Sequence, residues 1–331
     1  MEEMGGDRKD RKDGGGAPGH LPEPRVYARG EGLPAHGGGA PCALKNKGGS
    51  EPSAERREPS TQGWQGWDDY ARFYDWENAR TLGRRDVPFW QALARRAEGP
   101  ILELGSGTGR VTLPVGRVAR MPLIGIDRSD PMLSYARRRL RRARTVNGVA
   151  LVRGDIRALP FGLHTGFHLV MAPYGILQSL VREADLAAAL QSVVQVLAPG
   201  GLLGIDLVPD LPQWSEYRHR VRLRGFRRAG RSHVTLVESV RQDRRRQITI
   251  FDQVFIERRG RLRTQHNFSL TFRTLSVPQM RLRLERAGLR VEAVLGDYEG
   301  GPWDPRADVW LILARKEGRD GKDGKDGKDR N

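Results

Sequence analysis

The sequence predicts an α/β protein whose core is a doubly wound, Rossmann-like sheet, and two observations carry this prediction. Residues 101–104 form a short apolar run that breaks into Gly105, Gly107 and Gly109, as a buried parallel strand does where it turns into a helix. Further apolar runs of strand length follow up to residue 208, most of them separated by segments long enough for helices. Sheets of this kind bind nucleotide-like ligands where their strands end.

Helices and strands follow one another in the expected order. One helix is predicted around Tyr70 and Tyr74, and a second starts near Asp86, has Pro88 in its first turn and ends at Gly99. The strands of the sheet are predicted at residues 101–104, 123–127, 150–155, 167–174 and 202–208, with helices starting at Ser129 and spanning residues 183–197.

The chain's last elements return to this sheet. Ser276 and Gln279 have the spacing of a capping box, which predicts a helix up to residue 287 that Gly288 ends. Two strands, at residues 291–295 and 309–314, then complete the fold.

Carboxylates stand at the ends of three successive strands. Glu103 lies two residues ahead of the first glycine, Asp127 ends the second strand and Asp155 follows the third. Asp127 comes about 20 residues after the glycines, the distance at which an acidic residue reaches a ribose in such folds. Arg110 stands where a dinucleotide fingerprint needs its third glycine, and the Glu103 carboxylate is expected to face the pocket, so the site suits a ligand with a cationic end better than a pyrophosphate.

These motifs resemble those of the class I S-adenosylmethionine-dependent methyltransferases. The family's E-x-G-x-G-x-G pattern is matched by Glu103, Gly105, Gly107 and Gly109, and its Leu-x-Pro-Gly-Gly turn before a strand is matched at residues 197–201. The resemblance covers roughly residues 67–316 and is nearest to small-molecule N-methyltransferases. It implies S-adenosylmethionine as the cofactor.

The resemblance also implies a role for each cofactor residue. The backbone of Gly105, Ser106 and Gly107 would approach the methionine portion, and Glu103 would receive its ammonium group. The ribose and adenine would be bound by Asp127 with its neighbour Arg128, by Asp155 and the backbone of Ile156, and by Met132 against the ring.

The methyl-transfer end is expected just after the fourth strand, at Ala172, Pro173 and Tyr174, with Tyr174 as the leading candidate. Tyr70 and Tyr74 are four residues apart and therefore share one helix face. In the resembling enzymes such a segment folds over the cofactor. The alternative is a helix that only packs its aromatic residues on a sheet.

Residues 209–275 are predicted to form an inserted antiparallel β subdomain that covers the acceptor site. Its strands are expected at residues 234–237, 247–256 and 268–272, with a hairpin turn at Arg259 and Gly260. The residues available to line the acceptor pocket are Trp214, Tyr217, His233 and His266. If the acceptor is a hydroxyl, it needs a base, and His233 and His266 are the candidates.

The predicted domains are a core at residues 63–208, the insertion at 209–275 and the closing helix and strands at 276–317. Residues 1–62 and the Gly-Lys-Asp repeat of residues 318–331 have low complexity and few apolar side chains, so both are expected to be disordered.

Composition excludes several classes of site. Cys42 is the only cysteine, and the histidines show no metal-ligand spacing, so neither a disulfide nor a metal is expected. No apolar run approaches the ~18 residues of a membrane span, which predicts a soluble, cytoplasmic protein.

The net charge of +17 lies almost wholly in residues 63–317. Clusters such as Arg137, Arg138 and Arg139 could hold phosphates, but no lysine occurs between Lys47 and Lys316, so arginine has replaced lysine throughout this part. We therefore expect methyl transfer to a small molecule, on nitrogen or oxygen, by in-line displacement. An RNA or protein methyltransferase and a non-catalytic cofactor-binding regulator are the alternatives.

Overall fold

The computed structural model describes one part of the chain in detail. The described residues are 66–143, 146, 148–162, 165–209 and 216–318, all within the compact unit Ser53–Asn331. The predicted N-terminal tail, Cys42, Trp214 and residues 319–331 lie outside them.

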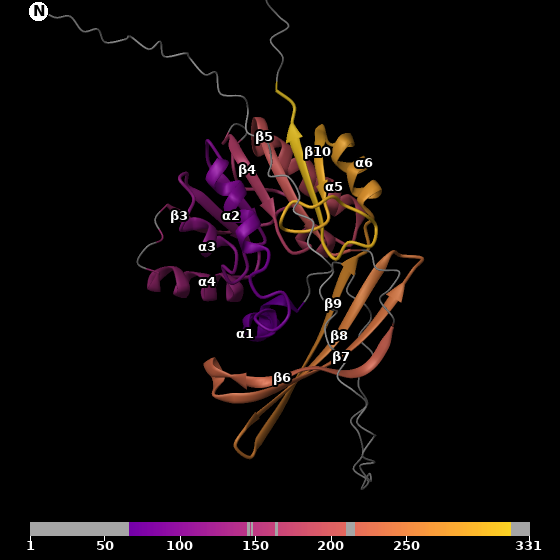
Figure 1. Ribbon diagram of the computed structural model, residues 1–331. Helices are drawn as coiled ribbons and strands as arrows, with labels where there is room; N and C mark the ends of the chain where they lie inside the picture. Colours follow the sequence, from indigo (N-terminus) through magenta and orange to yellow (C-terminus); the bar gives the residue numbers. More distant parts are fainter. Residues whose placement is uncertain (1–65, 144–145, 147, 163–164, 210–215, 319–331) are drawn as a thin grey trace, which may run out of the picture. The chain divides into compact units, whose positions relative to one another are not determined.

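Seven strands form a mixed sheet (Figure 1). They lie side by side in the order β10 (Leu289–Leu295), β11 (Trp310–Lys316), β5 (Leu197–Leu207), β4 (Phe167–Ala172), β1 (Ile101–Leu104), β2 (Leu123–Asp127) and β3 (Val149–Arg153). The five strands from β5 to β3 are parallel, and β11 runs antiparallel to both β5 and β10. The predicted Rossmann-like sheet is confirmed, and its order reverses beside β1, where such sheets bind their ligand.

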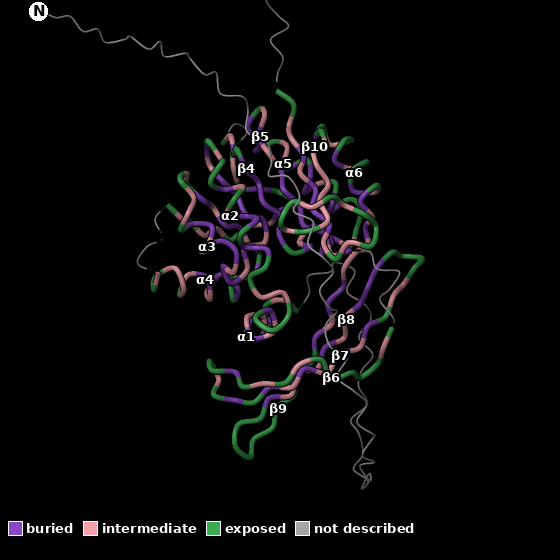
Figure 2. The backbone as a smooth tube through the Cα atoms, viewed as in Figure 1, coloured by how far each residue is buried: buried purple, intermediate pink, exposed green. Residues whose placement is uncertain are grey.

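Alternating side chains build a core on each face of this sheet. On one face, Leu169 and Met171 of β4 pack with α2 (Val87–Arg96) and the short α3 (Thr112–Gly116). On the other face, Val170 and Ala172 pack with α5 (Glu183–Val196) and α6 (Val277–Arg286). Strands covered on both faces are buried throughout, which Figure 2 shows as purple stretches through the central strands.

The predicted helix caps are present in the structure. Ser129 accepts the backbone N–H of Met132 at the start of α4 (Asp130–Arg142), and Ser276 and Gln279 form the capping box of α6. Asp86 precedes α2 as expected, but its carboxylate binds Arg110 instead of capping the helix.

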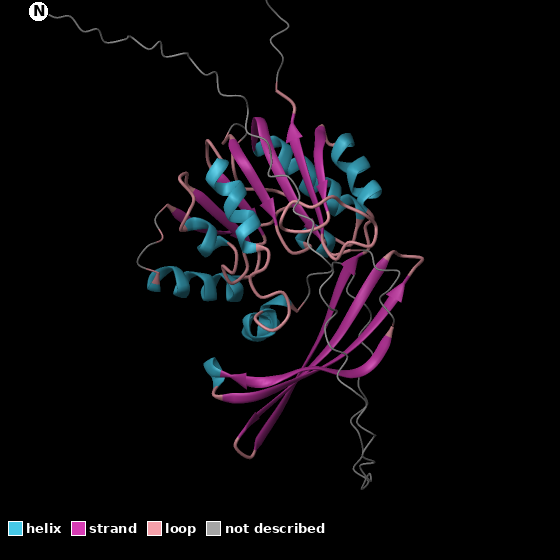
Figure 3. Ribbon diagram, viewed as in Figure 1, coloured by secondary structure: helices cyan, strands magenta, loops and turns pink. Residues whose placement is uncertain are grey.

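The insertion is a separate four-stranded antiparallel sheet with long strands (Figure 3). Its order is β6 (Tyr217–Arg227), β7 (Ser232–Asp243), β8 (Ile248–Arg259) and β9 (Leu262–Arg273), with a 3-10 turn (Arg228–Gly230) after β6. The hairpin at Arg259 and Gly260 is confirmed. Sequence reasoning missed β6, because arginines between its apolar residues resembled a basic cluster.

Helix α1 (Trp67–Asn78) packs against this second sheet (Figure 1). The rings of Phe73 and Phe255 are stacked with their centroids 4.4 Å apart, and both side chains are fully buried. Burying a side chain of this size contributes about 1.5–3 kcal/mol to folding.

Gln178 of the core and Arg273 at the end of β9 link the insertion to the core. The Gln178 side chain, in the 3-10 turn Ile176–Ser179, donates to the backbone oxygens of Val208 and Arg273. Arg273 in turn donates to the backbone oxygen of Val181. The second sheet is thereby fixed beside the carboxyl ends of β4 and β5.

Candidate functional site

A cavity of about 550 Å³ opens at the carboxyl ends of the parallel strands. Its floor comes from the loops after β1, β2, β3 and β4, and α1 together with Phe272 of β9 covers it. Of the residues predicted for the cofactor or the reaction, those that line it are Tyr74, Glu103, Gly105, Ser106, Gly107, Asp127, Arg128, Met132, Asp155, Ile156, Pro173 and Tyr174.

The glycine loop needs its glycines for two different reasons. Gly105 has a φ of 65°, and a side chain there would come within 2.5 Å of Ile176. Gly109 has a φ of 76° and faces Leu113, which would lie 2.2 Å from an added Cβ. Gly105 therefore lets Ile176, which lines the cavity, pack closely against the loop, whereas Gly109 lets the following helix pack closely and does not line the cavity.

Polar atoms without partners gather at the β1 end of the cavity. Glu103 is 2 % exposed, and its Oε2 atom has no hydrogen-bond partner within the described residues. The same is true of Ser106 Oγ and Arg110 Nε. Burial raises the pKa of Glu103 to about 8. Unpaired buried groups cost free energy, so this end of the cavity suits a ligand that carries both an amine and a carboxylate.

Asp127 holds the glycine loop in place. Its Oδ2 accepts the backbone N–H of Gly107 and its Oδ1 that of Ser129, both at 2.8 Å. Burial raises the pKa of Asp127, although these hydrogen bonds favour its ionised form. Each carboxylate oxygen has a second lone pair, which leaves Asp127 able to accept two hydroxyl groups of a ligand.

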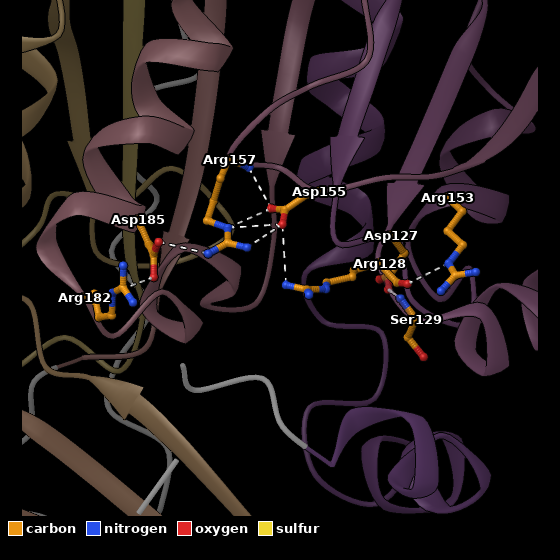
Figure 4. Close-up of polar contacts among 8 residues, drawn as sticks. All are labelled: Asp127, Arg128, Ser129, Arg153, Asp155, Arg157, Arg182 and Asp185. Atoms are coloured by element: carbon orange, nitrogen blue, oxygen red, sulfur yellow. Dashed lines mark hydrogen bonds and ion pairs between the residues drawn. The ribbon is translucent and has the colours of Figure 1, made fainter. Parts of the chain in front are cut away.

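Arginines surround Asp155 at the other end of the cavity (Figure 4). The Arg157 side chain donates to both carboxylate oxygens of Asp155, at 2.6 to 3.1 Å, and also to Asp185 at 2.9 Å. Arg128 lies 3.4 Å from the same carboxylate. Hydrogen bonds from Arg157 are the main reason that the pKa of Asp155 is lowered. A contact between Asp155 and an adenine amino group stays a prediction, and it would share a carboxylate that Arg157 already binds.

Tyr174 forms the cavity wall beyond β4. The Arg110 guanidinium lies 5.4 Å from the centre of its ring and forms a two-pronged ion pair with the buried Asp86. The Tyr174 hydroxyl is neutral near pH 7, because a phenol titrates at about pH 10 and desolvation raises the pKa of Tyr174 further. Pro173 lines the cavity beside it, whereas Ala172 is fully buried in the core below.

The two tyrosines of α1 have different environments. Tyr74 lines the cavity. Tyr70 does not, because it is packed against Phe255 and Phe268 and its hydroxyl donates to Glu77 at 2.5 Å. Helix α1 is thus both a cover for the cavity and a packing element for the second sheet.

The structure does not bring the two predicted histidine bases to the cavity. His233 is exposed, with its ring beside Phe226, and its neighbour Val234 faces α1 instead. His266 packs against Phe73 of α1, and its Nε2 lies 3.9 Å from a carboxylate oxygen of Glu257. Burial lowers the pKa of His266. Tyr217, another predicted pocket residue, donates its hydroxyl to Glu238 and does not line the cavity.

Sequence reasoning missed several cavity residues. Trp67, Asp68 and Asp69 lie in the first turn of α1 and line the cavity together with Phe272. Arg110 and Arg157 were also missed. Of these residues, only Arg110 could have been singled out from the sequence, because it stands where a dinucleotide fingerprint has its third glycine.

Among the residues that the structure describes, no group of histidine, cysteine, aspartate or glutamate side chains has the geometry of a metal site. Within the same residues no helix is long and apolar enough to cross a membrane.

Comparisons with known proteins find similarity to methyltransferases. A family model described as a methyltransferase domain matches residues 101–201. A ubiquinone/menaquinone biosynthesis C-methyltransferase from Shewanella frigidimarina is 33% identical over 122 residues, which cover 35% of this chain and 47% of that protein. The chain thus spans about half the length of that relative.

Two longer matches cover more of the chain. A cypemycin N-terminal methyltransferase from a Streptomyces species is 25% identical over 237 residues, covering 69% of this chain and 88% of that protein. The solved sugar N-methyltransferase KedS8 from a Streptoalloteichus species shares the fold with a TM-score of 0.60 at 14% identity, covering 83% of this chain and all of that one.

Proposed function

We propose that this chain, which carries a class I S-adenosylmethionine-dependent methyltransferase domain, moves the cofactor's methyl group to an amine nitrogen of a small molecule. The observation that carries the amine assignment is the cover of the cavity. Trp67 and Phe272 line it there, with their ring centroids 6.2 Å apart, and the acidic residues Asp68 and Asp69 line it in the same turn of α1 as Trp67. Aromatic faces and carboxylates both attract an ammonium group.

The residues with unpaired polar atoms fit the cofactor's amino-acid end. Glu103 would accept hydrogen bonds from the ammonium group, and Arg110 and Ser106 would bind the carboxylate. When bound, S-adenosylmethionine supplies a methyl group already activated by the positive charge on sulfur.

The remaining cavity residues fit the cofactor's nucleoside end. Asp127, flanked by Arg128, would accept hydrogen bonds from the ribose hydroxyls. Met132 and Ile156 would pack against the adenine, with Asp155 at its amino group.

Catalysis would then rest mainly on positioning. Pro173 and Tyr174 line the cavity directly after β4, so they would set the approach of the acceptor nitrogen. A neutral amine needs no base before it attacks, whereas a hydroxyl does. Because neither His233 nor His266 lines the cavity, the site favours an amine.

Two of the similar proteins support the same class of acceptor, although the Shewanella relative is a C-methyltransferase. The cypemycin enzyme is an N-terminal methyltransferase and KedS8 is a sugar N-methyltransferase. The first of these is the reason to keep a second candidate acceptor, the N-terminal amine of a peptide.

The arginines of α4 give little support to a nucleic-acid acceptor. Arg139 binds Asp75 and the backbone oxygen of Thr108, and Arg137 pairs with Asp130. The Asn-Pro-Pro-Tyr type signature of base methylation is also absent, since Ala172, Pro173 and Tyr174 stand there.

A turnover assay tests the proposal. The protein is incubated with S-adenosylmethionine and a metabolite extract, and formation of S-adenosylhomocysteine is measured. We expect formation that is lost when the extract's amines are first acylated and that is insensitive to RNase. Sensitivity to protease would indicate the peptide acceptor. Cofactor binding without any S-adenosylhomocysteine, under all conditions, would favour the non-catalytic regulator.

A further inference from the structure

The turn that follows β4 has an unusual backbone. Tyr174 has a φ of 54° and Gly175 a φ of 65°, so two consecutive residues adopt the left-handed conformation. Glycine does this at little cost, but a residue with a bulky side chain does not. Such strain persists only where surrounding groups hold it, and it is concentrated at functional sites.

Asp206, near the end of β5, holds this turn through two hydrogen bonds and accepts a third from Tyr298. Its Oδ2 accepts the backbone N–H of Tyr174 at 3.2 Å and the hydroxyl of Tyr298 at 2.8 Å. Its backbone oxygen accepts the N–H of Gly175 at 2.9 Å. Asp206 is 4 % exposed and does not line the cavity, so it acts on a ligand only through the turn.

Tyr298 reaches Asp206 from the far end of the chain. It lies in the loop between β10 and β11, and its ring packs beside Phe89 of α2, with centroids 6.2 Å apart. Because β11 is inserted between β5 and β10, this loop comes next to the end of β5. The topology of the last two strands thus brings a hydroxyl donor to a buried carboxylate behind the cavity wall.

We propose that Asp206, oriented by Tyr298, is a positioning residue that fixes the strained backbone of Tyr174 and thereby aligns the acceptor for methyl transfer. This inference rests on the proposed function. Methyl transfer and cofactor affinity should respond differently, because the groups assigned to the cofactor's amino-acid and ribose ends belong to other loops. Methyl transfer should depend on Asp206, whereas cofactor affinity should not.

The ionisation of Asp206 gives a second readout. Burial raises its pKa to about 6, while the hydrogen bonds from Tyr298 and from the Tyr174 backbone favour the ionised form. The charged groups nearby are Asp86, which raises this pKa, and Arg110, which lowers it. Turnover should therefore fall as the pH drops through about 6. Removing the Tyr298 hydroxyl should move this fall to higher pH.

The test measures kcat, KM and cofactor Kd against pH for the wild type, Asp206→Asn and Tyr298→Phe, with the acceptor identified in the turnover assay. We expect Asp206→Asn to lower kcat by about tenfold or more, since small misplacements of reacting groups are costly. Its cofactor Kd should stay within about twofold of the wild type. Tyr298→Phe should keep part of the rate and shift the acidic limb upward. Asp252→Asn is the matched control, because that carboxylate also accepts a hydroxyl, from Ser269, in the second sheet.

Hydrogen exchange of the peptide covering residues 173–178 separates failure of this inference from failure of the proposed function, because it needs no acceptor. Faster exchange in Asp206→Asn and Tyr298→Phe, but not in Asp252→Asn, would support the positioning role even if no amine were methylated. Wild-type exchange in both variants, or a wild-type kcat with an unshifted acidic limb, would overturn it.

Discussion

At the scale of single residues, the cavity contains ionisable groups whose charged forms are opposed by burial. Glu103 is the clearest case, since the folded protein holds its proton up to a pH of about 8. A carboxyl whose pKa is higher in the folded than in the unfolded state makes the fold less stable as pH rises between the two values. A bound ammonium group would stabilise the ionised carboxylate. Glu103 therefore lowers the stability of the free protein and raises its affinity for the ligand.

Glu103→Gln should therefore have opposite effects on stability and on binding. We expect the ligand-free variant to melt at a higher temperature than the wild type at pH 8, because the amide is neutral. Its affinity for S-adenosylmethionine should fall by about tenfold or more, since a charge-assisted hydrogen bond is lost. Thermal melts with and without cofactor measure both effects. A variant that is less stable and binds normally would show that Glu103 is structural.

Asp127 should be essential for the ribose. We expect Asp127→Ala to weaken cofactor binding by about tenfold or more, because it removes hydrogen-bond acceptors worth about 1.5–3 kcal/mol and also frees the glycine loop. Calorimetric titration gives the Kd. Asp130→Ala is the matched control, as Asp130 is a nearby exposed aspartate paired with Arg137. Equal Kd values for the two variants would refute the assignment.

At the scale of elements, sequence patterns predicted what is local and missed what depends on packing. Apolar runs and caps gave the strands of the main sheet and the starts of α4 and α6, because these features are encoded by neighbouring residues. Strand β6 was not predicted, because the arginines between its apolar residues resemble a basic cluster. In the site, strand-end carboxylates such as Glu103 and Asp127 were predictable. Phe272 and Arg157 were not, because only the tertiary fold brings them to the cavity.

The positions of His233 and His266 could not be predicted for a similar reason. Alternation along a strand tells which residues share a face, but not which face meets α1 or the cavity. His233 is therefore on the exposed face and His266 is packed against α1, outside the cavity.

Helix α1 depends on its stacking against the second sheet. We expect Phe73→Ala to lower the free energy of unfolding by about 3–5 kcal/mol, since it leaves a cavity beside Phe255. Cofactor affinity should fall as well, because α1 covers the cavity. Phe226→Ala, which truncates an exposed ring on β6, should change stability by less than about 0.5 kcal/mol. Denaturant unfolding measures both. A small effect of Phe73→Ala would show that α1 is held elsewhere.

At the scale of the whole molecule, the net positive charge bears on whether the acceptor is a small molecule or a nucleic acid. Arg138, Arg141 and Arg142 lie on the exposed surface of α4, away from the cavity lining. Replacing all three by glutamine should leave turnover of a small amine within about twofold of the wild type, with little dependence on salt. Rates measured from low to high salt test this. A steep loss of wild-type activity with salt would instead indicate a nucleic-acid acceptor.

We propose that one cavity binds S-adenosylmethionine and presents an amine to its methyl group. The most direct test of this proposal supplies cofactor labelled with ¹³C in the methyl group and identifies the labelled product by the carbon shift, which distinguishes methyl on nitrogen from methyl on oxygen. We predict label on nitrogen, formed at a rate lower by about tenfold or more in Asp127→Ala when the cofactor is well below its Kd. Label found only on oxygen, or a wild-type rate in Asp127→Ala under the same conditions, would contradict this proposal.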